Sequence, residues 1–462
     1  MQNSQLVQLM QAFSPQEKKE IRRFLQSPYF NTRTDTIRLF EYCCTAENWD
    51  KEAVKSAIFE PKTASDEQLR LLMTYLMRLL ETWIAQKEFD ENTTQQNLLL
   101  ASGLRKRGLT MAFERQKKWL EKHLEQQPLR DTTFYDARYH LHWEMHQLVS
   151  STKPTYTEHL EKASIAADIA YIAQKMRIIC LSAAQQEVYS SDFYAAWENE
   201  VVAFAEQYFA QKEVVVAIYL HCYKMLRQPQ EEVHFQRFKN MLLESLRLFA
   251  PDENKGFFVW AINYCVKRLN QGQKHYFKEV TDLYKSGLEQ GILLENGEIS
   301  TYTYYNVVVA GLQTQDLEWV NFFIYQYKNH LPKQHRDSAF SFCLARLEYT
   351  QKNFGAVLEL LQKVNYRDTL VNLAAKTLLL KTWFELGEYE ALQSHLDAMR
   401  NFIHRKKVLG YHRTNYLNIL KYTDKMLNLN KLDKSEQQKL RESIQKEENL
   451  TERDWLLEKL GG

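Results

Sequence analysis

The chain has 462 residues, which is more than a single hydrophobic core usually holds. Glycine contributes only 13 residues and proline 8, against usual shares of about 7% and about 5%. Folds rich in strands and tight turns need both residues, so the composition favours long helices with few connections. The 60 Lys and Arg nearly balance the 58 Asp and Glu. This balance argues against a dedicated nucleic-acid binder, and 45% hydrophobic residues exclude a globally disordered chain.

The cysteines and the apolar stretches indicate the compartment. The six cysteines form no C-x-x-C pair and are Cys43, Cys44, Cys180, Cys222, Cys265 and Cys343. We interpret them as small buried apolar side chains of a protein in a reducing compartment. Residues 1–13 lack the features of a secretion signal, and no apolar stretch approaches the ~20 residues that cross a bilayer. We therefore expect a cytoplasmic protein that does not contact a membrane.

Two capping boxes predict helix starts near the beginning of the chain. The Ser14–Glu17 and Ser65–Gln68 segments each place side chains where they can satisfy the first free amides of a helix. The first helix is expected to end before Ser27, because the residue before a proline avoids helical angles. The second helix is predicted over residues 69–89, from apolar residues at three-and-four spacing. Residues 1–125 are therefore predicted to form a helical N-terminal region of unknown role.

Helical segments are predicted to follow one another through residues 126–430. Breaks between segments of roughly 15–25 residues, long enough for antiparallel helix pairs, are expected near Gln127, Thr152, Ser190, Gln228, Ala250, Asn270, Gly291, Leu331 and Asn365. No segment alternates as a strand does, so the predicted fold class is all-α. The charged residues 431–462, with helix starts at Asp433 and Thr451, are predicted to cap the open end of the helical stack.

A turn recurs in the C-terminal part of the chain. Asp316–Leu317, Asn353–Phe354 and Glu388–Tyr389 each pair a polar residue with an apolar anchor between two helical segments, and the anchors are 37 and 35 residues apart. A period of about 34 residues is typical of stacked helix–turn–helix repeats. Such stacking buries the apolar faces of successive pairs and leaves a curved surface lined by the first helix of each pair. An irregular helical bundle is the alternative interpretation.

These residues resemble the tetratricopeptide repeat family. In LGEYEAL at 386–392, Gly387 and Tyr389 match the family's turn, and Leu379 and Trp383 match its first helix. The other matches are Leu392, Leu396 and Met399 in the same copy, Leu344, Ala345, Phe354, Val357, Leu361 and Val364 in the copy before, Val307, Val308, Leu317, Val320, Ile324 and Pro332 in the next copy back, and Ala183, Ala184, Phe193, Ala196 and Ala203 in a weaker fourth copy.

The resemblance is to a degenerate repeat. Leu392 and Met399 are larger than the family's usual alanines, and Glu348 stands where an aromatic residue is common. The resemblance covers residues 298–405 best, is weak over 130–297, and implies a right-handed solenoid of antiparallel helix pairs. Further back, SPQEKKEIRRFLQSPYFN at 14–31 is similar to the start of uncharacterised bacterial helical proteins, a similarity that implies no function.

The resemblance also implies a function. We expect a non-catalytic scaffold or adaptor that binds an unidentified protein or peptide on the concave face of the solenoid. The inward positions carried over from the family are Tyr302, Tyr305, Phe342, Arg346, Thr377, Lys381 and Phe384. Arg346 and Lys381 occupy equivalent positions in successive repeats, and we expect them to form a short row of cations for an acidic peptide or a chain carboxylate.

A metal-dependent enzyme is one alternative. His142 and His146 are four residues apart, so both project from one helical face toward a possible metal. Glu144, however, lies on roughly the opposite face, whereas the H-E-x-x-H motif holds its glutamate beside the metal. We interpret these histidines as structural. Glycine-rich phosphate loops and nucleophile elbows are also missing from the sequence, so we predict no catalytic residue, no metal and no cofactor.

A nucleic-acid-associated regulator is the other alternative. Basic residues cluster at Arg105, Lys106 and Arg107, in a predicted turn, and again at Lys117 and Lys118. Exposed arginine and lysine contact phosphates irrespective of base sequence. A solvated basic loop explains the same residues, and the net charge of +2 favours that explanation.

Overall fold

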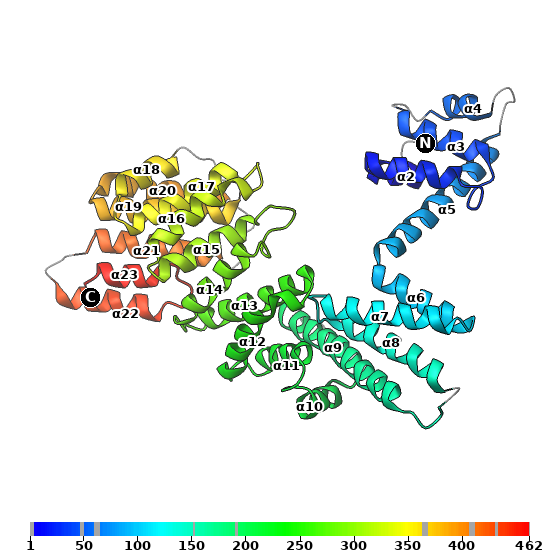
Figure 1. The fold of residues 1–462 in the computed structure, drawn as a ribbon. Helices are drawn as coiled ribbons and strands as arrows, with labels where there is room; N and C mark the ends of the chain where they lie inside the picture. Colours follow the sequence, from blue (N-terminus) through cyan, green and yellow to red (C-terminus); the bar gives the residue numbers. More distant parts are fainter. Residues whose placement is uncertain are drawn as a thin grey trace. The chain divides into compact units, whose positions relative to one another are not determined.

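The computed structural model describes residues 4–46, 50–59, 65–150, 153–189, 193–362, 368–405, 412–429 and 433–461. Over these ranges the predicted all-α fold is confirmed: helices follow one another along the chain, and the only bridge is an isolated one between Glu295 and Glu298 (Figure 1). The predicted breaks at Thr152, Ser190 and Asn365, the matched Val364 and the predicted boundary at 430/431 lie outside the described residues.

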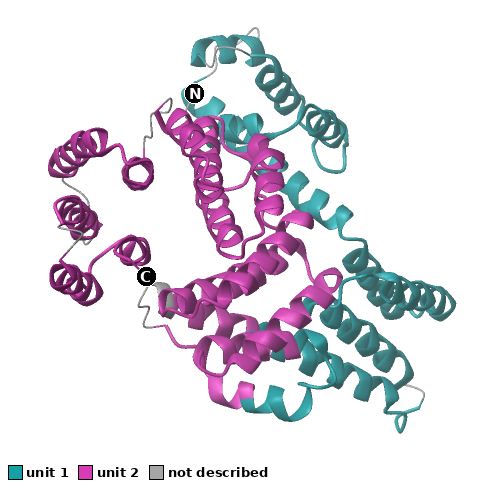
Figure 2. Cartoon of the chain, turned by 90° about the vertical axis from the view of Figure 1, so that its left-hand side faces the viewer, with its two compact units in different colours: residues 1–176, 203–216 teal, residues 177–202, 217–462 magenta. Residues whose placement is uncertain are grey.

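The chain forms two compact units (Figure 2). Unit 1 comprises residues 1–176 and 203–216, and unit 2 comprises residues 177–202 and 217–462. Unit 1 contains α1 (Gln5–Ala12), α2 (Pro15–Gln26), α3 (Thr34–Thr45), α4 (Lys51–Phe59), α5 (Asp66–Glu91), α6 (Thr93–Lys106), α7 (Thr110–Gln126) and α8 (Thr132–Ser150). Residues of both units belong to α9 (Glu158–Tyr189), α10 (Glu198–Tyr208) and α11 (Val214–Arg227). The predicted boundary after residue 125 stays a prediction.

The remaining helices belong to unit 2. They are α12 (Glu232–Ser245), the 3₁₀ turn η1 (Leu246–Leu248), α13 (Pro251–Asn270), α14 (Tyr276–Glu289), α15 (Thr301–Gln313), α16 (Leu317–Gln326), the 3₁₀ turn η2 (Lys328–His330), α17 (Arg336–Thr350), α18 (Phe354–Gln362), α19 (Thr369–Leu386), α20 (Tyr389–Arg405), α21 (His412–Leu427), α22 (Lys434–Lys446) and α23 (Arg453–Lys459).

Both predicted capping boxes are present in unit 1. The Ser14 hydroxyl accepts from the Glu17 amide at 3.2 Å, and the Glu17 carboxylate accepts from the Ser14 amide at 2.7 Å. Ser65 and Gln68 make the same reciprocal pair at 3.2 and 3.0 Å. The helix that starts at Pro15 ends at Gln26, as the proline at position 28 predicts. These signals act over four residues, so the local sequence is sufficient to place them.

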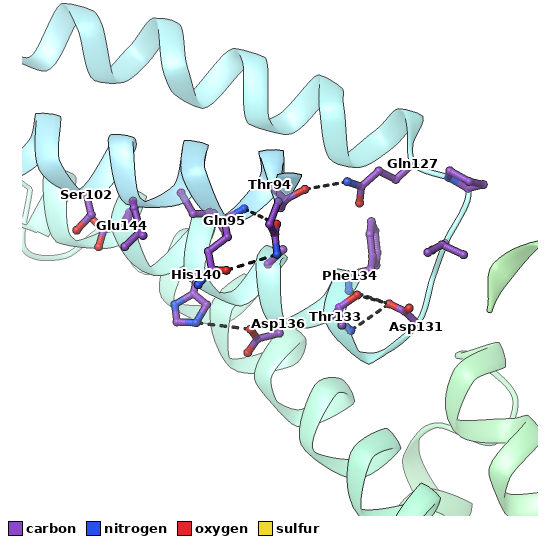
Figure 3. A pocket seen from close by; sticks show the side chains of 16 residues that line it. Thr94, Gln95, Ser102, Gln127, Asp131, Thr133, Phe134, Asp136, His140 and Glu144 are labelled. Carbon is purple, nitrogen blue, oxygen red and sulfur yellow. Dashed lines mark hydrogen bonds and ion pairs between the residues drawn. The ribbon is translucent and has the colours of Figure 1, made fainter. Parts of the chain in front are cut away.

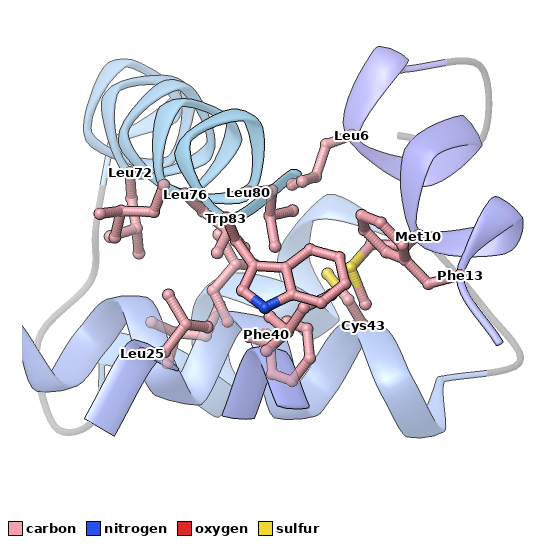
Figure 4. Close-up of a cluster of buried hydrophobic side chains, with 14 of the residues drawn as sticks. Leu6, Met10, Phe13, Leu25, Phe40, Cys43, Leu72, Leu76, Leu80 and Trp83 are labelled. Carbon is pink, nitrogen blue, oxygen red and sulfur yellow. The ribbon is translucent and has the colours of Figure 1, made fainter. Parts of the chain in front are cut away.

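The helices α1 to α5 share a hydrophobic core (Figure 4). Trp83 of α5 lies among Met10, Phe13 and Phe40, and its ring meets the Phe13 ring edge-on at a centroid distance of 5.6 Å. Leu76 and Leu80 of α5 are completely buried in the same cluster. The first part of α5 therefore holds the N-terminal helices together.

In unit 2 the helices pack in neighbouring pairs. Each of α15, α17 and α19 packs against the helix that follows it, and α17 also contacts α15 and α19. Apolar residues of α17, α18 and α19 share one buried cluster that includes Phe342, Val357 and Leu378. Gly311 lets α15 and α16 approach closely, because a Cβ atom there would lie 2.4 Å from a Val320 methyl group. The contacts of α17 with both α15 and α19 place these three helices in one row.

The three predicted turns adopt the same backbone conformation. Gln315, Lys352 and Gly387 all have left-handed φ angles, of 59°, 64° and 74°. The amide that follows each of them donates to the carbonyl five residues earlier, in the pairs Asp316–Gly311, Asn353–Glu348 and Glu388–Trp383 at 3.2, 2.9 and 3.1 Å. This is the Schellman arrangement that ends a helix, and the next helix begins one residue later at Leu317, Phe354 or Tyr389.

Substitution of Gly387 should test this turn. A Cβ atom added at Gly387 would meet no other atom within 4 Å, so the effect of Gly387→Ala reports the left-handed backbone alone. We expect Gly387→Ala to lower the free energy of unfolding by about 1 kcal/mol. Gly256, inside α13, has equally open surroundings, and Gly256→Ala should raise that free energy by about 0.5–1 kcal/mol. Urea denaturation of both variants measures the change in the free energy of unfolding. A change of the same sign in both variants would contradict the left-handed turn at Gly387.

The thiols offer a second test of the fold. All six cysteines are free, five are buried, and Cys44 alone is half-buried. Burial raises the pKa of Cys43 to about 12 and also raises that of Cys44. Because the thiolate is the reactive form, a coloured disulfide reagent near neutral pH should label Cys44 slowly and the other five only after unfolding in urea. Rapid modification of several thiols in the folded protein would show that the core is more open than described.

Candidate binding cavity

A cavity of about 400 Å³ in unit 2 collects four of the seven residues predicted to contact a partner. Phe342 and Arg346 reach it from α17, and Thr377 and Lys381 reach it from α19. In each pair the residues are four apart and therefore lie on one helical face. We call this space, which is completed by α15, Tyr416 and the turn before α23, the unit 2 cavity.

Lys381 is already paired within the chain. Its ammonium lies 2.7 Å from the Glu452 carboxylate, in the turn before α23, and only 13% of the Lys381 side chain is exposed. The same ammonium lies over the rings of Tyr349 at 4.9 Å and Trp455 at 5.6 Å. The Thr377 hydroxyl donates to the Leu373 carbonyl of its own helix. Neither polar group is left without a partner.

Arg346 differs from Lys381. It is half-buried, and its guanidinium lies 5.6 Å from the Phe342 ring centroid. Within the described parts of the chain, its guanidinium has no carboxylate partner and no hydrogen-bond acceptor. Two cations and one carboxylate, Arg346, Lys381 and Glu452, are the charged residues of the cavity wall. One positive charge is therefore left over.

The turn that carries Glu452 has an uncommon backbone. Glu452 adopts a left-handed conformation, with φ 55° and ψ 32°, immediately before α23. A residue other than glycine in the left-handed conformation costs roughly 1–2 kcal/mol. Contacts around Glu452 must therefore hold its backbone in this conformation. One is the Arg453 guanidinium, which donates to the Glu447 carbonyl. The Lys381–Glu452 ion pair is another.

The three remaining predicted contact residues lie outside the unit 2 cavity. Tyr302 and Tyr305 line a smaller space of about 110 Å³. Tyr305 meets Phe342 edge-on at 5.6 Å, so its ring lies between the two spaces. Phe384 packs instead against Trp455 of α23, with ring centroids 5.4 Å apart.

Sequence reasoning missed the contact between α19 and α23 that lies beside the Lys381–Glu452 pair. The Glu385 carboxylate accepts from the Trp455 indole at 3.0 Å and from the Tyr349 hydroxyl at 3.2 Å, and it pairs with Lys459 at 2.8 Å. Trp455 and Leu456 are buried in a cluster formed with α19 to α22. The predicted helix start at Thr451 was the only available signal, and it does not show what α23 contacts.

The basic residues of the nucleic-acid alternative are partly neutralised in unit 1. Arg105 pairs with Glu144 at 2.5 Å, and Lys117 pairs with Glu114 at 2.8 Å. Lys106, Arg107 and Lys118 are exposed, and the Arg107 guanidinium donates to the Gly103 carbonyl of α6.

The histidines considered as metal ligands do not gather. His142 is half-buried and stacks on His159, with ring centroids 6.1 Å apart. Burial lowers the pKa of His142 to about 4, which keeps this ring neutral. His146 lies beside Trp143. Over the described ranges, no group of three or more His, Cys, Asp and Glu side chains is arranged to hold a metal ion.

A larger cavity of about 850 Å³ lies in unit 1, between α6, α8 and the connection before α8 (Figure 3). Its charged side chains have partners in the chain. The Asp131 carboxylate accepts from the amides of Thr133 and Phe134 at 3.0 and 3.1 Å. Asp136 lies 3.7 Å from His140, and Glu144 pairs with Arg105 outside the cavity lining. The smaller unit 2 cavity, whose Arg346 has no anion within the described ranges, is the better candidate for a charged ligand.

No protein-family model, curated protein or solved structure matches this chain. None of the helices described is both long enough and apolar enough to cross a membrane.

Neutralising Glu385 should weaken the contact between α19 and α23. Burial alone would raise the pKa of Glu385, but the Lys459 ammonium and the hydrogen bonds from Trp455 and Tyr349 outweigh it and lower that pKa. A pKa lowered by folding adds stability above the unfolded value of about 4.3, and this stability is lost as the pH falls through the folded value.

We therefore expect Glu385→Gln to lower the free energy of unfolding by about 1–2 kcal/mol at neutral pH. The difference from the unsubstituted protein should shrink as the pH falls below about 4. Urea denaturation at several pH values measures it. The exposed Glu388 provides the control Glu388→Gln, which should have little effect at any pH. A difference that grows in acid would contradict the assigned role of Glu385.

Proposed function

We propose that this protein is a non-catalytic scaffold or adaptor that binds an acidic segment of another protein in the unit 2 cavity. In this proposal unit 2 is a degenerate tetratricopeptide-like solenoid, and α15, α17 and α19 are the first helices of successive pairs. The repeated left-handed turn, 37 and then 35 residues apart, supports this assignment.

Arg346 is the observation on which the proposal depends. A half-buried guanidinium without an anion retains part of the desolvation cost of burial. A carboxylate from a partner would relieve that cost and could accept two parallel hydrogen bonds from the planar guanidinium. A single carboxylate would also neutralise the one positive charge left over among the cavity's charged residues.

The uncharged part of the wall suits a peptide side chain. Phe342, Leu378, Tyr349 and Tyr416 surround the arginine with apolar and aromatic surface. Burial raises the pKa of Tyr416, so its hydroxyl stays protonated near neutral pH and can donate to a ligand oxygen. A volume of about 400 Å³ is at the small end of the usual range for ligand sites, and it suits one or two side chains rather than a folded surface.

A nucleic-acid partner is less well supported than a protein partner. Arg105 and Lys117 are neutralised by glutamates of unit 1, which leaves three exposed cations from the cluster. Each phosphate contact contributes separately to affinity, so this loss weakens the case for a basic strip.

Removing the charge of Arg346 tests the proposed function. Partners of the tagged full-length protein would be captured by cross-linking in its native cells, and the binding segment of each would then be titrated against purified variants. We expect Arg346→Gln to weaken binding of the acidic partner by about tenfold or more, because a buried carboxylate loses its charged donor. Arg247, an exposed arginine of η1, supplies the control Arg247→Gln.

Equal binding by the unsubstituted protein, Arg346→Gln and Arg247→Gln would show that the partner uses another surface. Thermal unfolding of both variants checks that the fold is intact. Arg346 has no ion pair to lose within the described residues, so its neutralisation should leave stability nearly unchanged. This makes it a cleaner probe than Lys381, whose substitution would strand the Glu452 carboxylate.

A further inference from the structure

We infer that Glu452 occupies the place of a second partner carboxylate, so that the chain itself restricts the unit 2 cavity to segments that present one acidic group. The inference rests on the proposed function and adds the charge that the partner must carry. It makes Glu452, which sequence reasoning did not single out, a specificity-determining residue.

The geometry at Lys381 indicates that Glu452 takes the place of a partner carboxylate. The Glu452 carboxylate lies 2.7 Å from the ammonium, which is the distance expected for a charge-assisted hydrogen bond to a bound carboxylate. Both residues line the cavity. Glu452 therefore presents, from within the chain, the same chemical group that a partner would bring to Lys381.

The position of Tyr416 indicates that Glu452 would repel a second partner carboxylate. Besides burial, Glu452 raises and Arg346 lowers the pKa of Tyr416. The Tyr416 hydroxyl is therefore close enough to both charged groups to be affected by each. A partner carboxylate at Arg346 would share this small space with Glu452, and a second partner carboxylate would meet Glu452 instead of a free cation. Like charges at such short range disfavour binding.

The backbone of Glu452 indicates that the carboxylate itself has a role at this position. Its left-handed φ of 55° is a conformation that glycine adopts at lower cost. Glycine would also leave the α23 contacts of Trp455 and Leu456 in place. The presence of glutamate at a position suited to glycine is explained if its carboxylate is needed at Lys381.

The test compares peptides that carry one or two glutamates. Fluorescent hexapeptides with an amidated C-terminus and a phenylalanine beside a single glutamate would be titrated against the full-length protein by fluorescence anisotropy. In a matched set of peptides, a glutamine would be replaced by a second glutamate, and the number of residues between the two glutamates would vary from one peptide to the next. The protein should bind the single-glutamate peptides in an Arg346-dependent way and should gain little from the second glutamate.

Two variants remove the carboxylate with different effects on the backbone. Glu452→Gln keeps the length of the side chain, and Glu452→Gly suits the left-handed conformation and protects α23 against local unfolding. Both should bind the best two-glutamate peptide about tenfold more tightly than the unsubstituted protein does, with a smaller change for single-glutamate peptides. The exposed Glu448 supplies the control Glu448→Gln, which should leave both affinities unchanged.

The outcomes separate the two proposals. If both Glu452 variants keep the preference of the unsubstituted protein, or lose affinity for both peptide sets, the inference is wrong while Arg346-dependent binding still supports the proposed function. If no acidic peptide binds to any form of the protein, the proposed function and the inference are both overturned. A selective gain for two-glutamate peptides in both variants supports the inference.

Discussion

The left-handed residue that ends α15, α17 and α19 is the constraint on which the unit 2 cavity depends. At each of these positions the helix ends with the same Schellman hydrogen bond. One polar residue follows, and the next helix then begins. Each of the three helices is thereby joined to its successor by the same short turn. Arg346 and Lys381 are 35 residues apart in the chain, and they reach one cavity because α17 and α19 contact each other and share a buried cluster with α18.

Features encoded over a few residues could be predicted from the sequence. The Ser14 and Ser65 capping boxes act within four residues, and the recurrent turns are also local. The grouping of Arg346 with Lys381 followed from the resemblance to tetratricopeptide repeats, which implies equivalent inward positions for both residues. The contact between α19 and α23 could not be predicted in this way, because Glu385 and Trp455 are 70 residues apart and no repeat relates them. Phe384 therefore packs against Trp455, a neighbour that no local pattern identifies.

Charge, more than size, distinguishes the unit 2 cavity from the larger cavity between α6 and α8. The cavity of unit 1 has about twice the volume, but Asp131 and Glu144 already have partners there. Filling that cavity would bring no ionic gain. In the unit 2 cavity, Glu452 pairs with Lys381, and Arg346 has no anion among the residues that the structure describes. Because unpaired charge in a partly buried site is costly, the smaller cavity offers the larger difference in free energy between its empty and its occupied state.

The C-terminal helix links the stability of unit 2 to the composition of its cavity. Trp455 packs on Phe384, donates to Glu385 and covers the Lys381 ammonium. The turn before it delivers Glu452 to the same lysine. A change that loosens α23 would therefore withdraw a carboxylate from the cavity as well as uncover apolar surface. The α23 region thus has two physical roles, since it packs against α19 to α22 and sets the charge of the cavity wall.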